Sequence, residues 1–167
     1  MTLESDLLNI APMDYYTLVK TLHILSSTIL FGTGIGIAFF MFQSWISDNT
    51  HEKLYAVKNT VLADFLFTFP AVIIQPLSGM ALIHMVGFDW SAYWLMATYI
   101  IYFMAGLCWL PVVWIQVQLK KMCIEASKSG AELPERYNTL FKIWFLLGWP
   151  AFVGLIAVFY LMVAKPT

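Results

Sequence analysis

Residues 18–42 read LVKTLHILSSTILFGTGIGIAFFMF, and this stretch decides which class of protein the chain forms. It is apolar and contains no proline, and as an α-helix it would be about 37 Å long, more than the ~30 Å hydrocarbon core of a bilayer. It also holds an ionisable side chain, His23. Such a residue is costly in hydrocarbon, so a histidine inside a membrane span is a candidate functional residue by default.

The composition of the whole chain supports the same class. Hydrophobic residues make up 60% of the 167 residues and charged residues 11%, whereas a soluble domain carries roughly 25% charged residues. A chain of this length has room for about four spanning helices of ~20 residues each. We therefore predict an all-α fold, a transmembrane four-helix bundle that forms a single integral membrane domain over residues 1–167. The formal net charge of −1 gives no indication of nucleic-acid binding.

Polar segments divide the chain into four predicted spans joined by short loops. The second span contains Pro70 and Pro76. These prolines predict a kink or an unwound turn, which a membrane tolerates only where neighbouring groups hydrogen-bond the carbonyls left free. The predicted spans are residues 17–45, 54–86, 93–122 and 137–163.

The distribution of lysine and arginine predicts the orientation of the chain. Of the 9 basic residues, only Lys20 and Lys165 lie on the side of the termini. The others lie in or beside the loops after the first and third spans (Lys53, Lys58, Lys120, Lys121, Lys128, Arg136 and Lys142). The positive-inside rule then places both loops in the cytoplasm and both termini outside, in the periplasm. We expect a multi-pass protein of the bacterial inner (cell) membrane.

Two histidines are expected at similar depth near the outer side of the membrane. His23 lies ~9 Å inside the first predicted span, and His84 lies ~6 Å inside the second. Because these spans are antiparallel neighbours, the two imidazoles could ligate a haem b iron from both sides, with Ser27 beside the cofactor. Alternatively, each histidine bonds a neighbouring group or reaches the headgroup layer. A methionine is the alternative second ligand (Met80, Met85, Met96 or Met162).

Three glycines follow His23 in the first span, at positions 32, 34 and 36. Gly36 would lie ~20 Å from His23 along a helix, farther than a porphyrin reaches from its iron. Small residues four apart, such as Gly32 and Gly36, instead favour close packing between helices.

Asp64 is the one carboxylate predicted well inside a span. Two interpretations remain open. Asp64 is either a carrier of protons or the partner of Lys142 in an ion pair, since Lys142 enters the fourth span at a comparable depth. The amides of Gln75 and Gln116 are expected to form hydrogen bonds between helices.

Several catalytic classes leave signatures that this sequence does not contain. It has no Walker loop, no dinucleotide-binding fingerprint, no His-Glu-x-x-His motif and no Gly-x-Ser-x-Gly motif. Nucleotide-driven, zinc-peptidase and serine-hydrolase functions are therefore not indicated.

Segments of all four spans resemble known membrane families. Residues 19–24 resemble the first span of the HemJ-like protoporphyrinogen oxidases, which are four-helix membrane proteins. Residues 68–73 resemble their second span, and residues 141–166 resemble their last span and its Lys-Pro terminus. The chain is closer still to an uncharacterised bacterial family of four-span predicted integral membrane proteins, catalogued as a domain of unknown function. The segments that carry this second match are residues 62–70, 75–79 and 108–114.

These families look like members of one superfamily that includes the CopD-like copper-resistance proteins. The resemblance to the oxidases implies a haem b ligated through His23 and oxidation of protoporphyrinogen coupled to a membrane acceptor. Our leading hypothesis is a protein that binds haem b and takes part in membrane redox chemistry or electron transfer. The alternatives are a HemJ-like oxidase and a cofactor-free assembly or transport subunit in which Asp64 lines a polar path. The expected partners are the lipid bilayer, a quinone or membrane redox protein and, in a homo-oligomer, a second copy.

Overall fold

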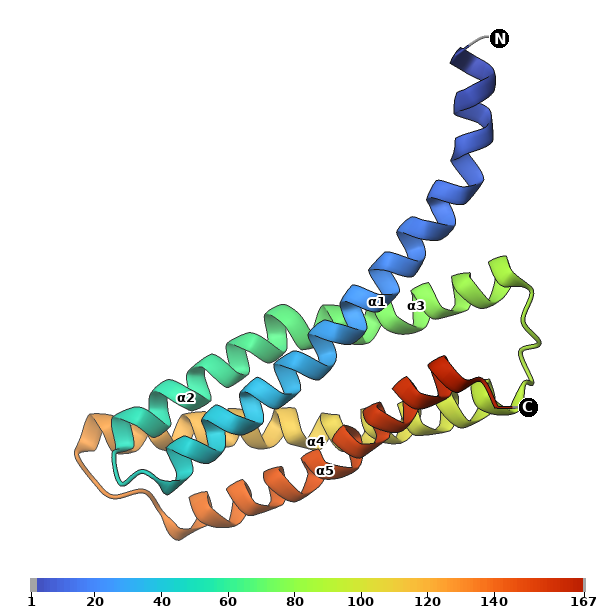
Figure 1. Ribbon diagram of the computed structural model, residues 1–167. Coiled ribbons are helices and arrows are strands. Elements are labelled where there is room, and N and C mark those ends of the chain that lie inside the picture. Colours follow the sequence, from blue (N-terminus) through green and yellow to red (C-terminus); the bar gives the residue numbers. More distant parts are fainter. Residues whose placement is uncertain (1–2, 167) are drawn as a thin grey trace.

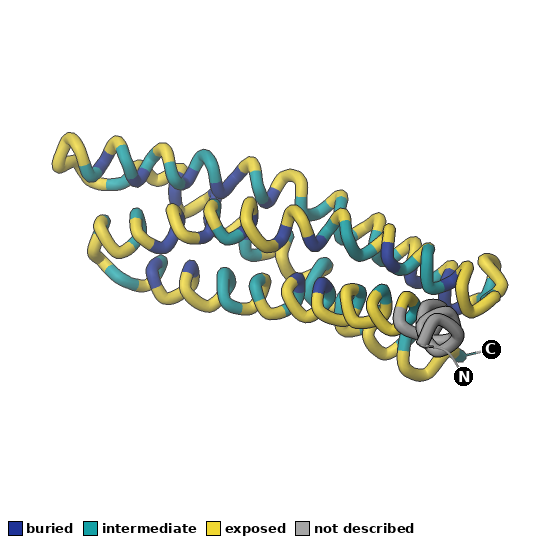
Figure 2. The backbone as a smooth tube through the Cα atoms, turned by 90° about the horizontal axis from the view of Figure 1, so that it is seen from above, coloured by how far each residue is buried: buried dark blue, intermediate teal, exposed yellow. Residues whose placement is uncertain are grey.

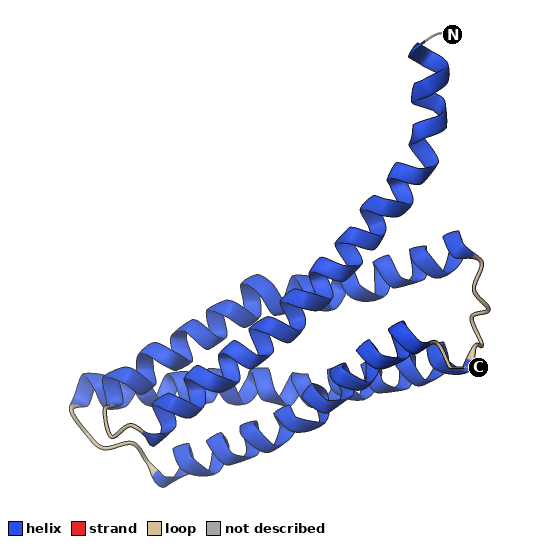
Figure 3. Ribbon diagram, viewed as in Figure 1, coloured by secondary structure: helices blue, strands red, loops and turns tan. Residues whose placement is uncertain are grey.

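The computed structural model describes residues 3–166 and the side chains of residues 15–166. Within that range every regular element is a helix, and none is a strand (Figure 3). This confirms the predicted all-α class. The elements are α1 (Leu3–Ile46), α2 (Thr50–Ala63), the π-helical turn η1 (Asp64–Thr68), α3 (Phe69–Val86), α4 (Tyr93–Ser129) and α5 (Glu135–Ala164).

The prediction of four membrane spans is confirmed. The segments long and apolar enough to cross a bilayer are Tyr15–Ile46, Thr50–Val86, Tyr93–Ser129 and Glu135–Ala164. Most of them extend further into polar sequence than predicted. The third helix, for example, continues past residue 122 to Ser129, because the residues in between include good helix formers. These added turns carry charged residues, so they belong in the interface or in water.

The helices form a bundle in which α1 packs on α3 and α2, α2 packs on α4, and α4 runs along α5 (Figure 1). The elements α2, η1 and α3 follow one another without a break, so they act as one spanning rod. At one end of the bundle α1 and α4 finish while α2 and α5 begin, on the left in Figure 1. We call it the lysine-rich end, because it holds the basic loops.

Most of the buried hydrophobic side chains form two clusters, one toward each end of the bundle. The larger cluster lies toward the lysine-rich end and includes Met41, Val57, Leu119, Tyr137 and Phe141. A smaller cluster at the opposite end is formed by Ile83, Trp94 and Leu95. The middle of the bundle lies between these clusters, and it is there that a cavity remains.

The outer faces of the helices are apolar. Buried residues line the inner sides of the helices, and exposed residues cover the outside (Figure 2). Large apolar side chains are among the most exposed, including Phe65 at 76% and Val163 at 85%. A surface of this kind is stable in contact with lipid, as expected for an integral membrane protein.

The prolines of the second span do not unwind it. Pro76 lies inside α3 and has no N–H to donate to the carbonyl of Val72, four residues earlier. The hydroxyl of Tyr102 on α4 donates to that carbonyl instead, at 2.6 Å. The predicted rescue of a free carbonyl by a neighbouring helix is therefore confirmed for Pro76. Pro70 lies in the first turn of α3, directly after the π-helical turn.

Candidate functional site

A cavity of about 480 Å³ lies in the middle of the bundle, between α1, η1, α4 and α5. We call it the Asp64 cavity, because Asp64 lines it. Glycines from three helices line it as well, namely Gly34, Gly106 and Gly148. A Cβ atom added at any of the three would have open space within 4 Å. Missing side chains on three different helices therefore help to keep this space empty.

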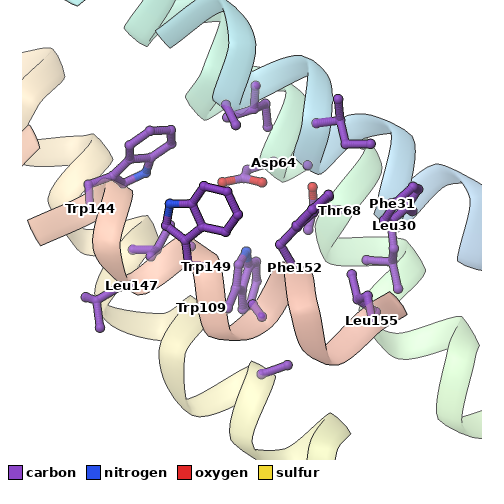
Figure 4. Close-up of a pocket in the computed structure, with 18 of the residues that line it drawn as sticks. Leu30, Phe31, Asp64, Thr68, Trp109, Trp144, Leu147, Trp149, Phe152 and Leu155 are labelled. Atoms are coloured by element: carbon purple, nitrogen blue, oxygen red, sulfur yellow. The ribbon is translucent and has the colours of Figure 1, made fainter. Parts of the chain in front are cut away.

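Polar side chains converge on the cavity from η1 and α4. Asp64 is 7% exposed, Thr68 8% and Gln116 1%. Trp109 lines the cavity as well, and Figure 4 shows its indole and the side chains of Asp64 and Thr68 directed toward the same space. Thr68, Gln116 and Trp109 are the groups whose side chains surround the Asp64 carboxyl.

These side chains lie within reach of the Asp64 carboxyl, but several of their polar atoms form no hydrogen bond of regular geometry within the chain. The atoms without a hydrogen-bond partner are Asp64 Oδ2, Thr68 Oγ1, Trp109 Nε1 and both amide atoms of Gln116. Buried polar atoms in proteins nearly always have partners, so each exception requires an explanation. Trp144 Nε1 is unpartnered as well, and Trp144 also lines the cavity, so six such atoms belong to residues around one space.

The π-helical turn positions two of the four groups. Residues Asp64–Thr68 form η1, in which the N–H of Phe69 donates to the carbonyl of Asp64 five residues earlier. The extra residue of such a turn changes the direction of the side chains that follow. π-helical turns of this type occur frequently at functional sites. Here the turn carries Asp64 at its start and Thr68 at its end, and both line the cavity.

Aromatic side chains form the wall of the cavity between α1 and α5. Phe31 stacks on Phe152, with ring centroids 5.3 Å apart, and Phe42 packs on Phe145 at 5.8 Å. Between these two contacts Trp149 is 50% exposed and also lines the cavity. Trp149 therefore contributes both to the wall of the cavity and to the outer surface of the bundle, and Figure 4 shows its indole beside Phe152.

His23 lies in a different place, at the contact of α1 with α3. Its Nδ1 atom is 2.9 Å from the hydroxyl of Ser78. That hydroxyl donates its only hydrogen to the carbonyl of Ile74 at 2.6 Å, with Gln75 O a weaker alternative at 3.2 Å. This arrangement of donors favours the tautomer in which Nδ1 of His23 donates to Ser78, and that tautomer leaves the lone pair of Nε2 free.

The amide of Gln75 holds the same stretch of α1. It donates to the carbonyl of His23 at 2.5 Å and to the hydroxyl of Ser26 at 2.6 Å. This confirms the predicted role of Gln75 in joining helices. A Cβ atom at Gly79 would lie 3.3 Å from His23 Cε1, so the glycine allows the imidazole to approach α3 closely.

The structure does not bring His84 to the same centre as His23. His84 is exposed on α3, about 9 Å along the helix from Ser78 and roughly a third of a turn around it. Two axial ligands of one iron would need their imidazoles on opposite sides of a single macrocycle. Ser27 is half-buried, and its hydroxyl donates to the carbonyl of Ile24 on its own helix at 2.7 Å. Among the described residues, no three His, Cys, Asp or Glu side chains form a metal-binding group.

Two other expectations need correction. Gly32, Gly34 and Gly36 do not pack closely on a neighbouring helix, since an added Cβ would meet nothing within 4 Å at any of them. Small-residue spacing identifies a helix face, but among the described residues no helix covers the face of these glycines closely. The ion pair between Asp64 and Lys142 is also not formed. Lys142 is exposed on α5, and the groups around the Asp64 carboxyl are uncharged.

Sequence reasoning identified Asp64 but missed Thr68, Trp109 and the glycines of α4 and α5. For Gln116 it predicted a hydrogen bond between helices, whereas neither amide atom of Gln116 has a hydrogen-bond partner in the described part of the chain. The spacing of Asp64 and Thr68, four residues apart in an apolar segment, was the available signal. No local pattern shows that Gly106 and Gly148 face the same space.

The fold and this site define a multi-pass helical membrane protein with a polar cluster at an internal cavity. The chain belongs to the DUF2269 family, described as predicted integral membrane proteins, whose family model matches residues 17–166. No curated protein and no solved structure matches the chain.

Proposed function

We propose that this protein binds a lipid-soluble molecule of the quinone class in the Asp64 cavity and exchanges a proton with it, as part of membrane redox chemistry. The observation that carries the proposal is the set of six unpartnered polar atoms on residues that line an apolar, aromatic-walled cavity. A ligand with a polar ring and an apolar body would satisfy both parts of the site.

The size and walls of the cavity favour a planar ring. Ligand pockets in proteins commonly measure roughly 300–1,000 Å³ and combine apolar walls with a few polar groups. At about 480 Å³ the Asp64 cavity lies within this range. Trp149 and Phe152, which pack edge to face with centroids 6.1 Å apart, offer aromatic surface beside it. Ring faces of this kind pack well on another aromatic ring.

The polar groups match the oxygens of a quinone and of its reduced form. Trp109 Nε1 is a donor only, and the Gln116 amide provides both donors and an acceptor. Either donor can bond a quinone carbonyl, while the amide oxygen and Asp64 can accept from a quinol hydroxyl. The reduction of a quinone takes up protons and the oxidation of a quinol releases them. A carboxyl group beside the ring oxygens can donate or accept one of those protons.

Quenching of tryptophan fluorescence tests the proposal directly, because Trp109 and Trp149 line the cavity. Purified protein in lipid nanodiscs would be titrated with decylubiquinone. We expect saturable quenching that is lost in Gly106→Leu, whose new side chain would occupy the cavity. Asp64→Asn preserves the shape and should weaken binding. Non-saturable quenching that is equal in all three proteins would contradict the proposal.

A second candidate function is haem b binding through His23. It is favoured by one observation, the hydrogen bond to Ser78 that leaves His23 Nε2 free. A histidine ligand commonly donates its other ring N–H to a neighbouring group in this way. His23 therefore fits as one axial ligand, whereas His84 does not lie opposite it. A bound haem would supply one-electron transfer near the outer end of α3.

Absorption spectroscopy of the detergent-solubilised protein tests this second candidate. A Soret band that disappears in His23→Ala and persists in His84→Ala would support it. Absence of the band in protein purified from haem-supplemented cells would remove it and leave the proposal for the Asp64 cavity unaffected.

A further inference from the structure

A second hollow runs between α1 and α2, on the other side of α1 from α5. It is a groove of about 850 Å³, and we call it the α1–α2 groove. It begins at His51 and Glu52, in the first turn of α2 at the lysine-rich end, and it reaches Ala63 and Phe67, beside Asp64. We propose that this groove is the route by which water and protons reach Asp64 from the lysine-rich end. The inference rests on the proton exchange proposed above.

Polar side chains follow the groove along both helices. From α2 it is lined by Asn59 and Thr60, and from α1 by Gln43 and Ser44. Thr60 is 3% exposed and Ser44 6%, so these hydroxyls belong to the interior of the groove. Polar groups at membrane depth are tolerated where they line a water-filled space. A groove with this lining can therefore hold water, and Thr60 lies one helical turn before Asp64.

The distance that water must cover is short. The rod from Thr50 to Val86 has 37 residues and is about 55 Å long, whereas the hydrocarbon core measures ~30 Å. The first turns of α2 therefore extend out of the hydrocarbon, which agrees with the lysines at positions 53 and 58. Asp64 lies only ~9 Å farther along the helix than Lys58. Fewer than two turns of helix therefore separate the interface from Asp64.

The other face of the same helix is different. Leu62 is 61% exposed, Phe65 76% and Leu66 59%, so this face contacts lipid at the same depth at which Asn59 and Ala63 face the groove. Beyond Lys58, the polar side chains of α2 are Asn59 and Thr60, and both line the groove. That asymmetry is expected for a helix that lines water on one side and contacts lipid on the other.

The groove and the Asp64 cavity share one residue. Ile37 lines both spaces, so its side chain stands where they meet. Beside it, Gly36 leaves open space within 4 Å of the position that a Cβ would occupy. Asp64 faces the cavity and Ala63 faces the groove, so water in the groove would reach the carboxyl group when the Ile37 side chain moves aside.

Cysteine accessibility tests the route directly. The background would carry Cys108→Ser and Cys123→Ala, since these are the two cysteines of the chain. Asn59→Cys, Ala63→Cys and Gly36→Cys place a thiol in the groove. Leu62→Cys and Leu66→Cys are matched controls on the lipid-facing side of the same rod. Each variant, reconstituted in lipid vesicles, would be treated from the lysine-rich end with a charged, membrane-impermeant methanethiosulfonate reagent.

We expect the groove thiols to react at least tenfold faster than the control thiols. Equal rates at groove and control positions would overturn the inference and would mean that lipid or a second copy of the chain fills the groove. Three groove positions keep the test valid if one variant fails to fold. The result is independent of quinone binding. If the groove thiols react but quinone gives no saturable quenching, the water route stands and the proposed ligand is wrong. If quinone gives saturable quenching but the groove thiols react no faster than the controls, the ligand stands and the water route is wrong.

Discussion

Asp64 and Thr68 occupy the two ends of one five-residue π-helical turn, and both side chains line the same cavity. Neither Asp64 Oδ2 nor Thr68 Oγ1 has a hydrogen-bond partner within the chain. An α-helix with a regular hydrogen-bond pattern would avoid the local distortion, and an apolar pair would avoid the unpaired polar atoms. The two features occur at the same place, which is where our proposed function requires a binding site.

In protein from which bound ligand has been removed, replacement of an unpaired polar atom in the cavity wall should stabilise the fold. Thr68→Val replaces the hydroxyl by a methyl group of similar size, and we expect the free energy of unfolding to rise by about 1 kcal/mol. Ser78→Ala is the matched control. Its hydroxyl is bonded to both His23 and Ile74, so its loss should destabilise by a similar amount. Thermal unfolding of both variants in the same detergent would show whether each substitution stabilises or destabilises the protein. Destabilisation by Thr68→Val would show that the Thr68 hydroxyl has a hydrogen-bond partner.

Glycine substitutions should differ in sign according to the space around each glycine. Gly148→Ala adds a methyl group where nothing lies within 4 Å, so the higher helix propensity of alanine should stabilise by about 0.5–1 kcal/mol. At Gly154 the same atom would lie 2.9 Å from Ile101 Cγ2. Gly154→Ala should therefore destabilise by roughly 1–3 kcal/mol through overpacking. If Gly148→Ala and Gly154→Ala destabilised the protein equally in thermal unfolding, other side chains would have to fill the space around residue 148.

The Gln75 amide should stabilise the packing of α1 on α3. It donates to both the His23 carbonyl and the Ser26 hydroxyl, so Gln75→Leu removes two hydrogen bonds between helices at once. We expect a loss of about 1–2 kcal/mol in the free energy of unfolding. Leu77→Ala, at a 58% exposed position of α3, is the control and should change stability much less. A similar effect of both substitutions would contradict the assigned role of Gln75.

The orientation of the chain is testable through reporter fusions. The positive-inside rule predicts that the lysine-rich end faces the cytoplasm. A reporter that is active only in the periplasm should therefore be inactive when inserted after Gly130 and active when fused after Lys165. Replacement of the basic residues at positions 120, 121 and 128 by glutamine should weaken this preference. The opposite pattern of activity would reverse the predicted topology and place the entrance of the α1–α2 groove outside.

The sequence predicts the spans well because apolar length and the absence of charge are local properties. It also identifies Asp64, since a carboxylate in hydrocarbon is conspicuous. The depth of a side chain is harder to predict. The levels of His23 and His84 were counted from predicted span ends, whereas the register of α1 on α3 is set by the packing of His23 against Ser78 and Gly79.

The cavity could not be predicted for a related reason. Its space arises because small residues on α1, α4 and α5 face one another, and that coincidence depends on the rotation of three helices. The spacing of Gly32 and Gly36 similarly identifies a shared face but says nothing about whether a neighbouring helix covers it. Trp109 was missed because tryptophans are common in membrane helices, and its unpaired N–H becomes evident only beside Asp64.

The most direct test of the central claim is the quinone content of the purified protein. Wild-type protein and Gly106→Leu would be purified from the same membranes in parallel, and isoprenoid quinones would be extracted and quantified by mass spectrometry. We predict close to one quinone per wild-type chain and only a trace in the variant with the filled cavity. Equal trace amounts in both proteins would contradict the account, because the Asp64 cavity would then hold no such molecule.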